Sequence, residues 1–117
     1  MALHKFSAKQ DHLVLALLVD MIYCFDLDNT LCLTVEGDYA NSQPIIDRIK
    51  KVNLLFNEGH TIKIFTARGS KTGLDWTELT KTQLDKWNVL HHELIFGKPD
   101  SDFFIDDKAI HADSFAW

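Results

Sequence analysis

The stretch MIYCFDLDNTLCL, residues 21–33, places two aspartates directly after a run of large apolar residues. The run Met21–Phe25 has the length and composition of a buried β-strand. Asp26 and Asp28 then fall where that strand would leave the core. Two carboxylates at this spacing are common in solvated turns and in calcium loops. Other residues of the chain are therefore needed to distinguish such a turn or loop from an active site.

The composition is that of one soluble globular domain. The chain has 117 residues, of which 46% are hydrophobic and 25% charged, and its net charge is −5. A chain of this size can bury a hydrophobic core. Its acidity disfavours duplex nucleic acid as a partner, because that binding depends on basic residues against phosphates. Of the two cysteines, Cys24 lies inside the apolar run, where we expect a core position, so reduced thiols and a cytoplasmic protein are favoured.

The first twenty residues have no pattern that continues into the rest of the chain. We expect an N-terminal extension over residues 1–20 and one domain over residues 21–117. The apolar tract Leu13–Phe25 is interrupted by Asp20 and is too short to span a bilayer, so no membrane partner is expected. The segment Leu13–Val19 would instead pack on an apolar surface of the domain, without contributing to the active site.

Strand and helix patterns alternate after Met21. Apolar residues recur at helical spacing from Ile45 to Phe56, with Ser42 as the expected N-cap, Pro44 in the first turn and Gly59 at the end. A second helix is expected over residues 76–87, a hairpin turn at 36–38, and further strands at 61–65, 92–97 and 102–107. The alternation predicts an α/β fold, a single-domain Rossmann-like three-layer sandwich with a central, mostly parallel sheet.

Polar side chains follow each expected strand, at the edge where open α/β sheets bind their ligands. Asp26 and Asp28 follow the first strand, and the strands after it end at Thr66, at Lys98 and at the pair Asp106–Asp107. Four carboxylates would repel one another unless a cation offset them. Oxygen ligands favour a hard ion such as Mg²⁺, so the pattern indicates phosphoryl transfer supported by a metal, a lysine and a hydroxyl.

Four short motifs carry a resemblance to a known family. DLDNT (residues 26–30), the threonine of IFTAR (Thr66), the lysine of GKP (Lys98) and FFIDD (residues 103–107) resemble the four motifs of the haloacid-dehalogenase-like (HAD) superfamily, in the same order. The resemblance implies an aspartyl-phosphate mechanism in which Asp26 is the nucleophile and Asp28 the general acid and base. Family members that act on carbon–halogen bonds lack the second acid, so Asp28 favours a phosphatase.

The resemblance also implies roles for the later motifs. Thr66 and Lys98 would hold the phosphoryl group, and Mg²⁺ would be held by Asp26, the backbone carbonyl of Asp28, and Asp106. Ala67 and Arg68 are further candidates for substrate binding. Asp107 would act through water or simply cap the next segment. Arg68 has a second reading, in which it pairs with Asp75 or Glu78 instead of forking onto a phosphate.

The spacing of the motifs leaves no room for a cap domain. A βαβ unit takes roughly 30 residues or more, and residues 29–65 and 67–97 are barely longer. The segments IFTAR, HELIFGKP and FIDDKAI are similar to those of small capless phosphatases of capsule and other surface-polysaccharide biosynthesis. This resemblance implies a sugar or polyol phosphate as substrate. The alternatives are a nucleic-acid end or nucleotide phosphatase, and a non-catalytic phosphate-binding or scaffolding module. Capless relatives often form oligomers, so a homo-oligomer in which a neighbouring subunit covers the active site is a further alternative.

Overall fold

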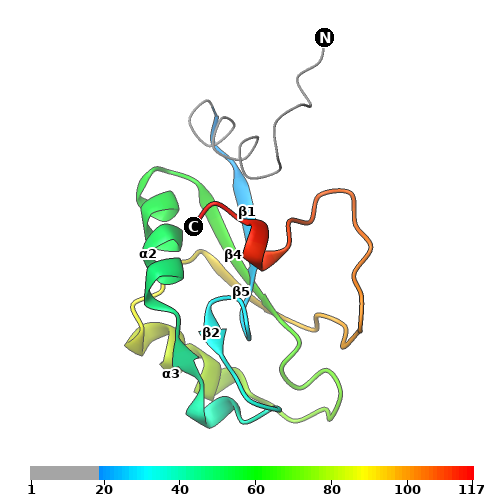
Figure 1. Cartoon of the computed structure of the whole chain (residues 1–117). Coiled ribbons are helices and arrows are strands. Elements are labelled where there is room, and N and C mark those ends of the chain that lie inside the picture. The colour runs from blue at the N-terminus through cyan, green and yellow to red at the C-terminus, as the bar shows by residue number, and fades with distance from the viewer. Residues whose placement is uncertain (1–18) are drawn as a thin grey trace.

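The computed structural model of the chain describes residues 19–117 and has a parallel three-stranded sheet at its centre (Figure 1). The strands are β1 (Ile22–Asp26), β4 (Thr61–Thr66) and β5 (Glu93–Phe96), in the order β1-β4-β5. Helix α2 (Ile46–Asn57) connects β1 to β4, and helix α3 (Thr77–Lys86) connects β4 to β5. The predicted single-domain α/β, Rossmann-like class is therefore confirmed, with three of its strands close to their expected bounds.

A small hairpin follows the first strand. Strand β2 (Cys32–Leu33) pairs antiparallel with β3 (Gln43–Pro44), and the 3-10 helix η2 (Tyr39–Asn41) lies between them. Glu36 and Gly37 have φ of 43° and 75°, the left-handed conformation of a tight turn, so the predicted hairpin tip is confirmed. The hairpin leads the chain from the end of β1 into α2.

Helix α2 packs the expected face on the sheet, but its predicted start is wrong. Ile49, Val52 and Leu55 are buried against the strands. The helix begins at Ile46 because Pro44 belongs to β3. Ser42 therefore lies too early to be the N-cap, and its hydroxyl lies 2.7 Å from that of Thr34.

The two faces of the sheet differ in burial. The buried face carries Ile62, Ile64 and Phe25, which pack with side chains of α2 and α3 and with Phe115 from the C-terminal end of the chain. Side chains on the other face alternate with these, and Ile22 there is 68% exposed. Residues 19–117 thus show two layers of the expected sandwich. The predicted core position of Cys24 is wrong, since Cys24 lies on the open face and is exposed.

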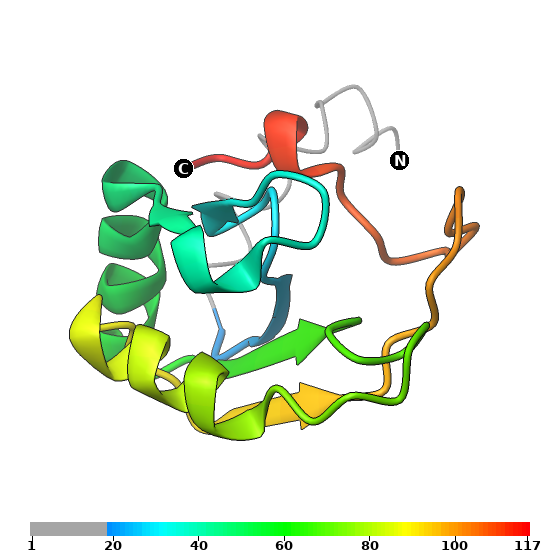
Figure 2. The ribbon, with the colours of Figure 1, turned by 90° about the horizontal axis from the view of Figure 1, so that it is seen from below.

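The predicted strand over residues 102–107 is also wrong. The chain runs outward after β5, with Phe103 84% exposed and Ile105 98% exposed (Figure 2). Local contacts take the place of a ladder: the Phe104 ring lies 4.7 Å from the Lys98 ammonium, and Asp106 accepts a hydrogen bond from Lys108 N. Among residues 19–117, β1 pairs only with β4, so its outer edge has no strand beside it.

The 3-10 helix η3 (Ala112–Ser114) brings the chain back towards β1 near its end (Figure 1). Within residues 19–117 no helix has the length and apolar character needed to cross a membrane. The expected extension over residues 1–20 lies outside the described residues except for its last two. Of the segment Leu13–Val19, which was expected to pack on the domain, only Val19 is described, and it is 53% exposed.

Candidate active site

The turn after β1 directs Asp26 and Asp28 to the carboxyl edge of the sheet. Leu27, between them, is fully buried, and its carbonyl accepts hydrogen bonds from the N–H groups of Thr30 (3.2 Å) and Leu31 (2.8 Å). Asn29 has φ of 61°, and its side-chain oxygen accepts a hydrogen bond from Thr34 N. The apolar side chain anchors the turn in the core, so the two carboxylates on either side of it face the cavity.

Asp26 is held by two partners from opposite sides. Its Oδ1 lies 3.0 Å from Lys98 Nζ, and its Oδ2 accepts a hydrogen bond from the Thr30 hydroxyl at 3.0 Å. Lys98 is placed by its own backbone, because its N–H donates to the Thr66 carbonyl and its carbonyl accepts from the Ser70 hydroxyl. The carboxyl ends of β1, β4 and β5 thereby bring the expected nucleophile and the expected lysine into direct contact.

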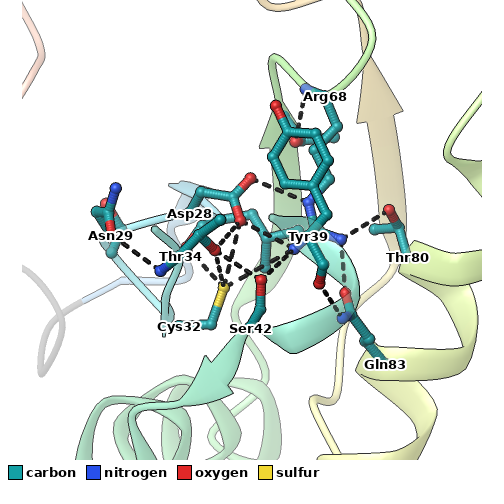
Figure 3. A network of polar contacts seen from close by, with 12 residues as sticks. Asp28, Asn29, Cys32, Thr34, Tyr39, Ser42, Arg68, Thr80 and Gln83 are labelled. Atoms are coloured by element: carbon teal, nitrogen blue, oxygen red, sulfur yellow. Dashed lines mark hydrogen bonds and ion pairs between the residues drawn. The ribbon is translucent and has the colours of Figure 1, made fainter. Parts of the chain in front are cut away.

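Asp28 is paired with Arg68, a partner that the sequence did not indicate. Arg68 Nε lies 3.0 Å from Asp28 Oδ2 and Nη2 lies 2.9 Å from Oδ1, a bidentate ion pair (Figure 3). The Thr34 hydroxyl donates to the same Oδ1 at 2.5 Å. Asp28 therefore has a fixed position and a fixed rotation of its carboxylate.

The structure pairs Arg68 with an acid that was not expected as its partner. Its side chain is 0% exposed and its fork is occupied by the two oxygens of Asp28, and its role in substrate binding stays a prediction. Asp75 is occupied at the start of α3, where hydrogen bonds from the Thr77 hydroxyl and then from the Thr77 N–H lower the pKa of its carboxyl. The Arg68 ion pair is made with Asp28 rather than with Asp75 or Glu78.

Thr66 is buried beneath the edge rather than exposed on it. Its side chain is 0% exposed, and its hydroxyl accepts a hydrogen bond from the Arg68 N–H at 3.1 Å. Ala67, the next residue, lines the cavity. Of the expected substrate-binding residues, Ala67, Arg68 and Lys98 thus line the cavity, and Thr66 accepts hydrogen bonds from the backbone N–H groups of Arg68 and Lys98.

The cavity at this edge has a volume of about 390 Å³ and is open to solvent. Asp26, Asp28 and Lys98 line it at the edge of the sheet. The hairpin tip and the chain after β5 also line it, with the acids Glu36 and Asp100 and the rings of Tyr39 and Phe104. The hairpin therefore contributes part of the cavity wall.

Asp106 and Asp107 do not join the other two aspartates in this arrangement. Neither lines the cavity, and both are exposed. A hydrogen bond from Lys108 N lowers the pKa of Asp106. Within residues 19–117 no three His, Cys, Asp or Glu side chains lie close enough together to hold a metal ion. The structure therefore brings together Asp26, Asp28 and Lys98, but not the four carboxylates expected of the magnesium site.

Four polar side chains around Asp28 and Arg68 were not anticipated as part of the site: Thr34, Ser42, Thr80 and Gln83. Thr80 interrupts the apolar face expected of the second helix, and Gln83 follows three residues later on the same face. Both are buried, which explains the polar positions on an inward face. A polar pair at this spacing is the signal that sequence reasoning could have used.

Comparison with known proteins gives two structural matches. A crystal structure of a target protein from Vibrio cholerae is 30% identical, with a TM-score of 0.72, and the match covers 80% of this chain and 85% of that one. A chain from a structure of a Pnkp1/Rnl/Hen1 complex has a TM-score of 0.53 at 18% identity, covering 75% of this chain and 30% of that one, which is a likeness of fold. No family model matches, and no curated protein does.

Proposed function

We propose that this chain, which belongs to the same family as the Vibrio cholerae protein, is a phosphomonoester hydrolase that works through Asp26. One observation carries the proposal: Asp26 and Asp28 leave the same strand end beside Lys98, whose Nζ lies 3.0 Å from Asp26 Oδ1. The cavity above them is wide enough for a small phosphate ester. The motif resemblance to HAD phosphatases supports the same assignment.

The reaction would proceed in two displacements. Asp28 first takes up a proton from solvent, because it is an ionised carboxylate in its pair with Arg68. An Asp26 carboxylate oxygen then attacks phosphorus while the ester P–O bond breaks, and Asp28 gives that proton to the leaving oxygen. Water then attacks the aspartyl-phosphate, Asp28 takes a proton from that water, and the bond between phosphorus and the Asp26 oxygen breaks to release inorganic phosphate. Lys98 would stabilise the negative charge on the transferred phosphoryl group.

Magnesium remains part of the proposal, although the described arrangement does not fit the complete metal site. Asp26 is paired with Lys98 and Asp28 with Arg68, so the two carboxylates already have partner cations. Asp26 and the backbone carbonyl of Asp28 are the groups that would hold a metal, whereas Asp106 is exposed and does not line the cavity. Bound there, Mg²⁺ would supply positive charge to the phosphoryl oxygens.

The cavity lining favours a small, uncharged leaving group. Glu36 and Asp100 line the cavity, where they would repel further phosphates of a nucleic-acid strand. A sugar or polyol phosphate, as in precursors of surface polysaccharides, carries only the phosphate that reacts. We propose this substrate class and a cytoplasmic enzyme, with homo-oligomer formation left to solution measurements.

The test is phosphate release from purified protein with Mg²⁺, across alkyl phosphates of sugars and polyols, nucleotides and an oligonucleotide with a terminal phosphate. Asp26→Asn should abolish turnover, and Asp85→Asn, which changes an exposed acid on α3, should leave it unchanged. Turnover of sugar or polyol phosphates above the others supports the proposal. Phosphate binding without any turnover would instead identify a non-catalytic module, and a preference for the oligonucleotide would identify a nucleic-acid end phosphatase.

A further inference from the structure

Arg68 is the most completely bonded side chain of the site. Its Nε and Nη2 hold Asp28, and Nη2 also donates to the Ser42 hydroxyl at 3.3 Å. Its Nη1 donates to the Thr80 hydroxyl at 3.1 Å and to Gln83 Oε1 at 2.5 Å. An arginine has five N–H donors, and each of these five contacts uses one. The guanidinium is therefore fixed in position, in orientation and in charge pairing (Figure 3).

The partners of Arg68 come from three separate parts of the chain. Asp28 belongs to the turn after β1, Ser42 to the hairpin, and Thr80 and Gln83 to α3. The hairpin is tied to the same centre a second time, because Gln83 Nε2 donates to the Tyr39 carbonyl at 2.6 Å. Arg68 thus connects the hairpin with one of the two aspartates that line the cavity.

The guanidinium also lies against an aromatic ring of the cavity lining. The centre of the Arg68 guanidinium is 4.8 Å from the centroid of the Tyr39 ring, within the range of a cation–π contact. Tyr39 lines the cavity and packs edge-on against Trp76, which precedes α3. The ring covers the guanidinium, which explains why a charged side chain beside an open cavity has no exposed surface.

We propose that Arg68 is the positioning residue for Asp28: it sets the place and rotation of the carboxylate that transfers the proton, without touching the substrate. This inference rests on the phosphatase function proposed above. The fork of two parallel N–H···O bonds fixes both carboxylate oxygens, which a lysine at the same place would not do. Gln83 and Ser42 fix the fork in turn, so the hairpin and α3 take part in aligning Asp28.

The test is a double-mutant cycle on turnover, with Arg68→Met, Asp28→Asn and both changes together. A misplaced catalytic group can cost about 100-fold, so Arg68→Met should lower kcat on an alkyl phosphate by about that factor and leave KM nearly unchanged. An aryl phosphate needs less protonation and should lose less. In the Asp28→Asn background, adding Arg68→Met should have almost no further effect, because the residue through which it acts is already disabled.

Two outcomes of the cycle would overturn the inference. If the losses of the two single variants multiply in the double variant, Arg68 acts independently of Asp28. If Arg68→Met raises KM at unchanged kcat, Arg68 binds the substrate. Arg68→Lys keeps the charge and loses the fork, so it should rescue little of the activity; full rescue would show that charge alone matters.

A milder variant guards against loss of the fold. Gln83→Met keeps Arg68 and Asp28 and removes one acceptor of the guanidinium together with the tie to Tyr39. It should lower kcat more on the alkyl than on the aryl phosphate, and an equal loss on both would count against positioning. Lys63→Met breaks a different ion pair on the sheet, with Glu93 at 3.6 Å, and should lose no activity.

The wild-type protein separates this inference from the function on which it rests. If wild type hydrolyses no phosphate ester, the proposed function falls, and the positioning role falls with it. If wild type is active and the cycle is multiplicative, only the role of Arg68 falls. Urea unfolding of wild type, the two single variants and the double variant tests whether the ion pair forms. If it does, the double variant should lose less unfolding free energy than the sum of the two single losses. Losses that simply add would contradict the pair.

Discussion

Gly69 and Gly73 allow a matched test of the loop that follows β4. Both have left-handed backbones, with φ of +84° and +76°. A Cβ added at Gly69 would lie 2.3 Å from the Leu74 carbonyl oxygen, whereas a Cβ at Gly73 would meet nothing within 4 Å. Alanine at either position has the same backbone cost, so the difference between the two variants isolates the steric clash at Gly69.

The expected magnitudes follow from these two geometries. The left-handed conformation costs an alanine about 1–2 kcal/mol, offset in part by about 0.4–1 kcal/mol from a less flexible unfolded chain. Gly73→Ala should therefore lower the free energy of unfolding by about 1 kcal/mol. Overpacking costs a further 1–3 kcal/mol or so, which brings the expected loss for Gly69→Ala to about 2–4 kcal/mol.

Urea unfolding at constant m-value measures both free energies. Gly69 lies between Arg68 and Ser70, whose hydroxyl donates to the Lys98 carbonyl at 2.6 Å. A shift of this loop should therefore also lower the proposed phosphatase activity, and Gly73→Ala should retain more of it. An equal or smaller loss of stability in Gly69→Ala would refute the close approach of Gly69 to Leu74.

Three further predictions concern thiols, metal and the N-terminus. At pH 8 a thiol reagent should label one cysteine per chain, because Cys24 is exposed and Cys32 is buried. Burial and then the Asp28 charge raise the pKa of Cys32 to about 11, so roughly one Cys32 thiol in a thousand is a thiolate at this pH. Rapid labelling of both cysteines in native protein would contradict the burial of Cys32. Millimolar Mg²⁺ should raise the melting temperature relative to chelator, because at one hundred times its Kd a ligand stabilises the folded state by about 2.7 kcal/mol. Calcium is the control ion, and an unchanged midpoint would count against a metal site. A chain beginning at Met21 should remain folded and active, and loss of soluble protein on this truncation would show that the first twenty residues belong to the core.

Local patterns predicted the parts of the fold that depend on local physics. The spacing of Ile49 and Val52 located α2, because helical periodicity is set by burial on one face. Residues 36–38 located the hairpin tip through turn preferences alone. The strands β4 and β5 likewise ended where polar residues follow apolar ones.

The errors arose where the outcome depends on distant neighbours. Cys24 has the composition of a core residue, but residues 19–117 cover only the opposite face of its strand. Residues 102–107 have a strand-like sequence, but they make local contacts instead of pairing with β1. Ser42 has the chemistry of an N-cap, and here its hydroxyl accepts from Arg68.

In the candidate site, too, local sequence predicted some residues, whereas other contacts depend on tertiary packing. Asp26, Asp28 and Lys98 were anticipated because each follows a strand of one parallel sheet, and their side chains do meet at one cavity. The pairing of Arg68 with Asp28 was not anticipated, since it depends on how α3 and the hairpin pack together. Residues forty apart in sequence carry no local signal of such a contact.

The most direct test of the account is the pre-steady-state release of leaving group by Asp26→Asn and Asp28→Asn, on an aryl and an alkyl phosphate with Mg²⁺. Asp28→Asn keeps the nucleophile, so with the aryl phosphate it should give a burst followed by slow turnover. On the alkyl phosphate it should lose about 100- to 10,000-fold, because proton transfer is needed in both half-reactions. Asp26→Asn should give neither burst nor turnover. A burst from Asp26→Asn, or full activity in either variant, would contradict the aspartyl-phosphate mechanism.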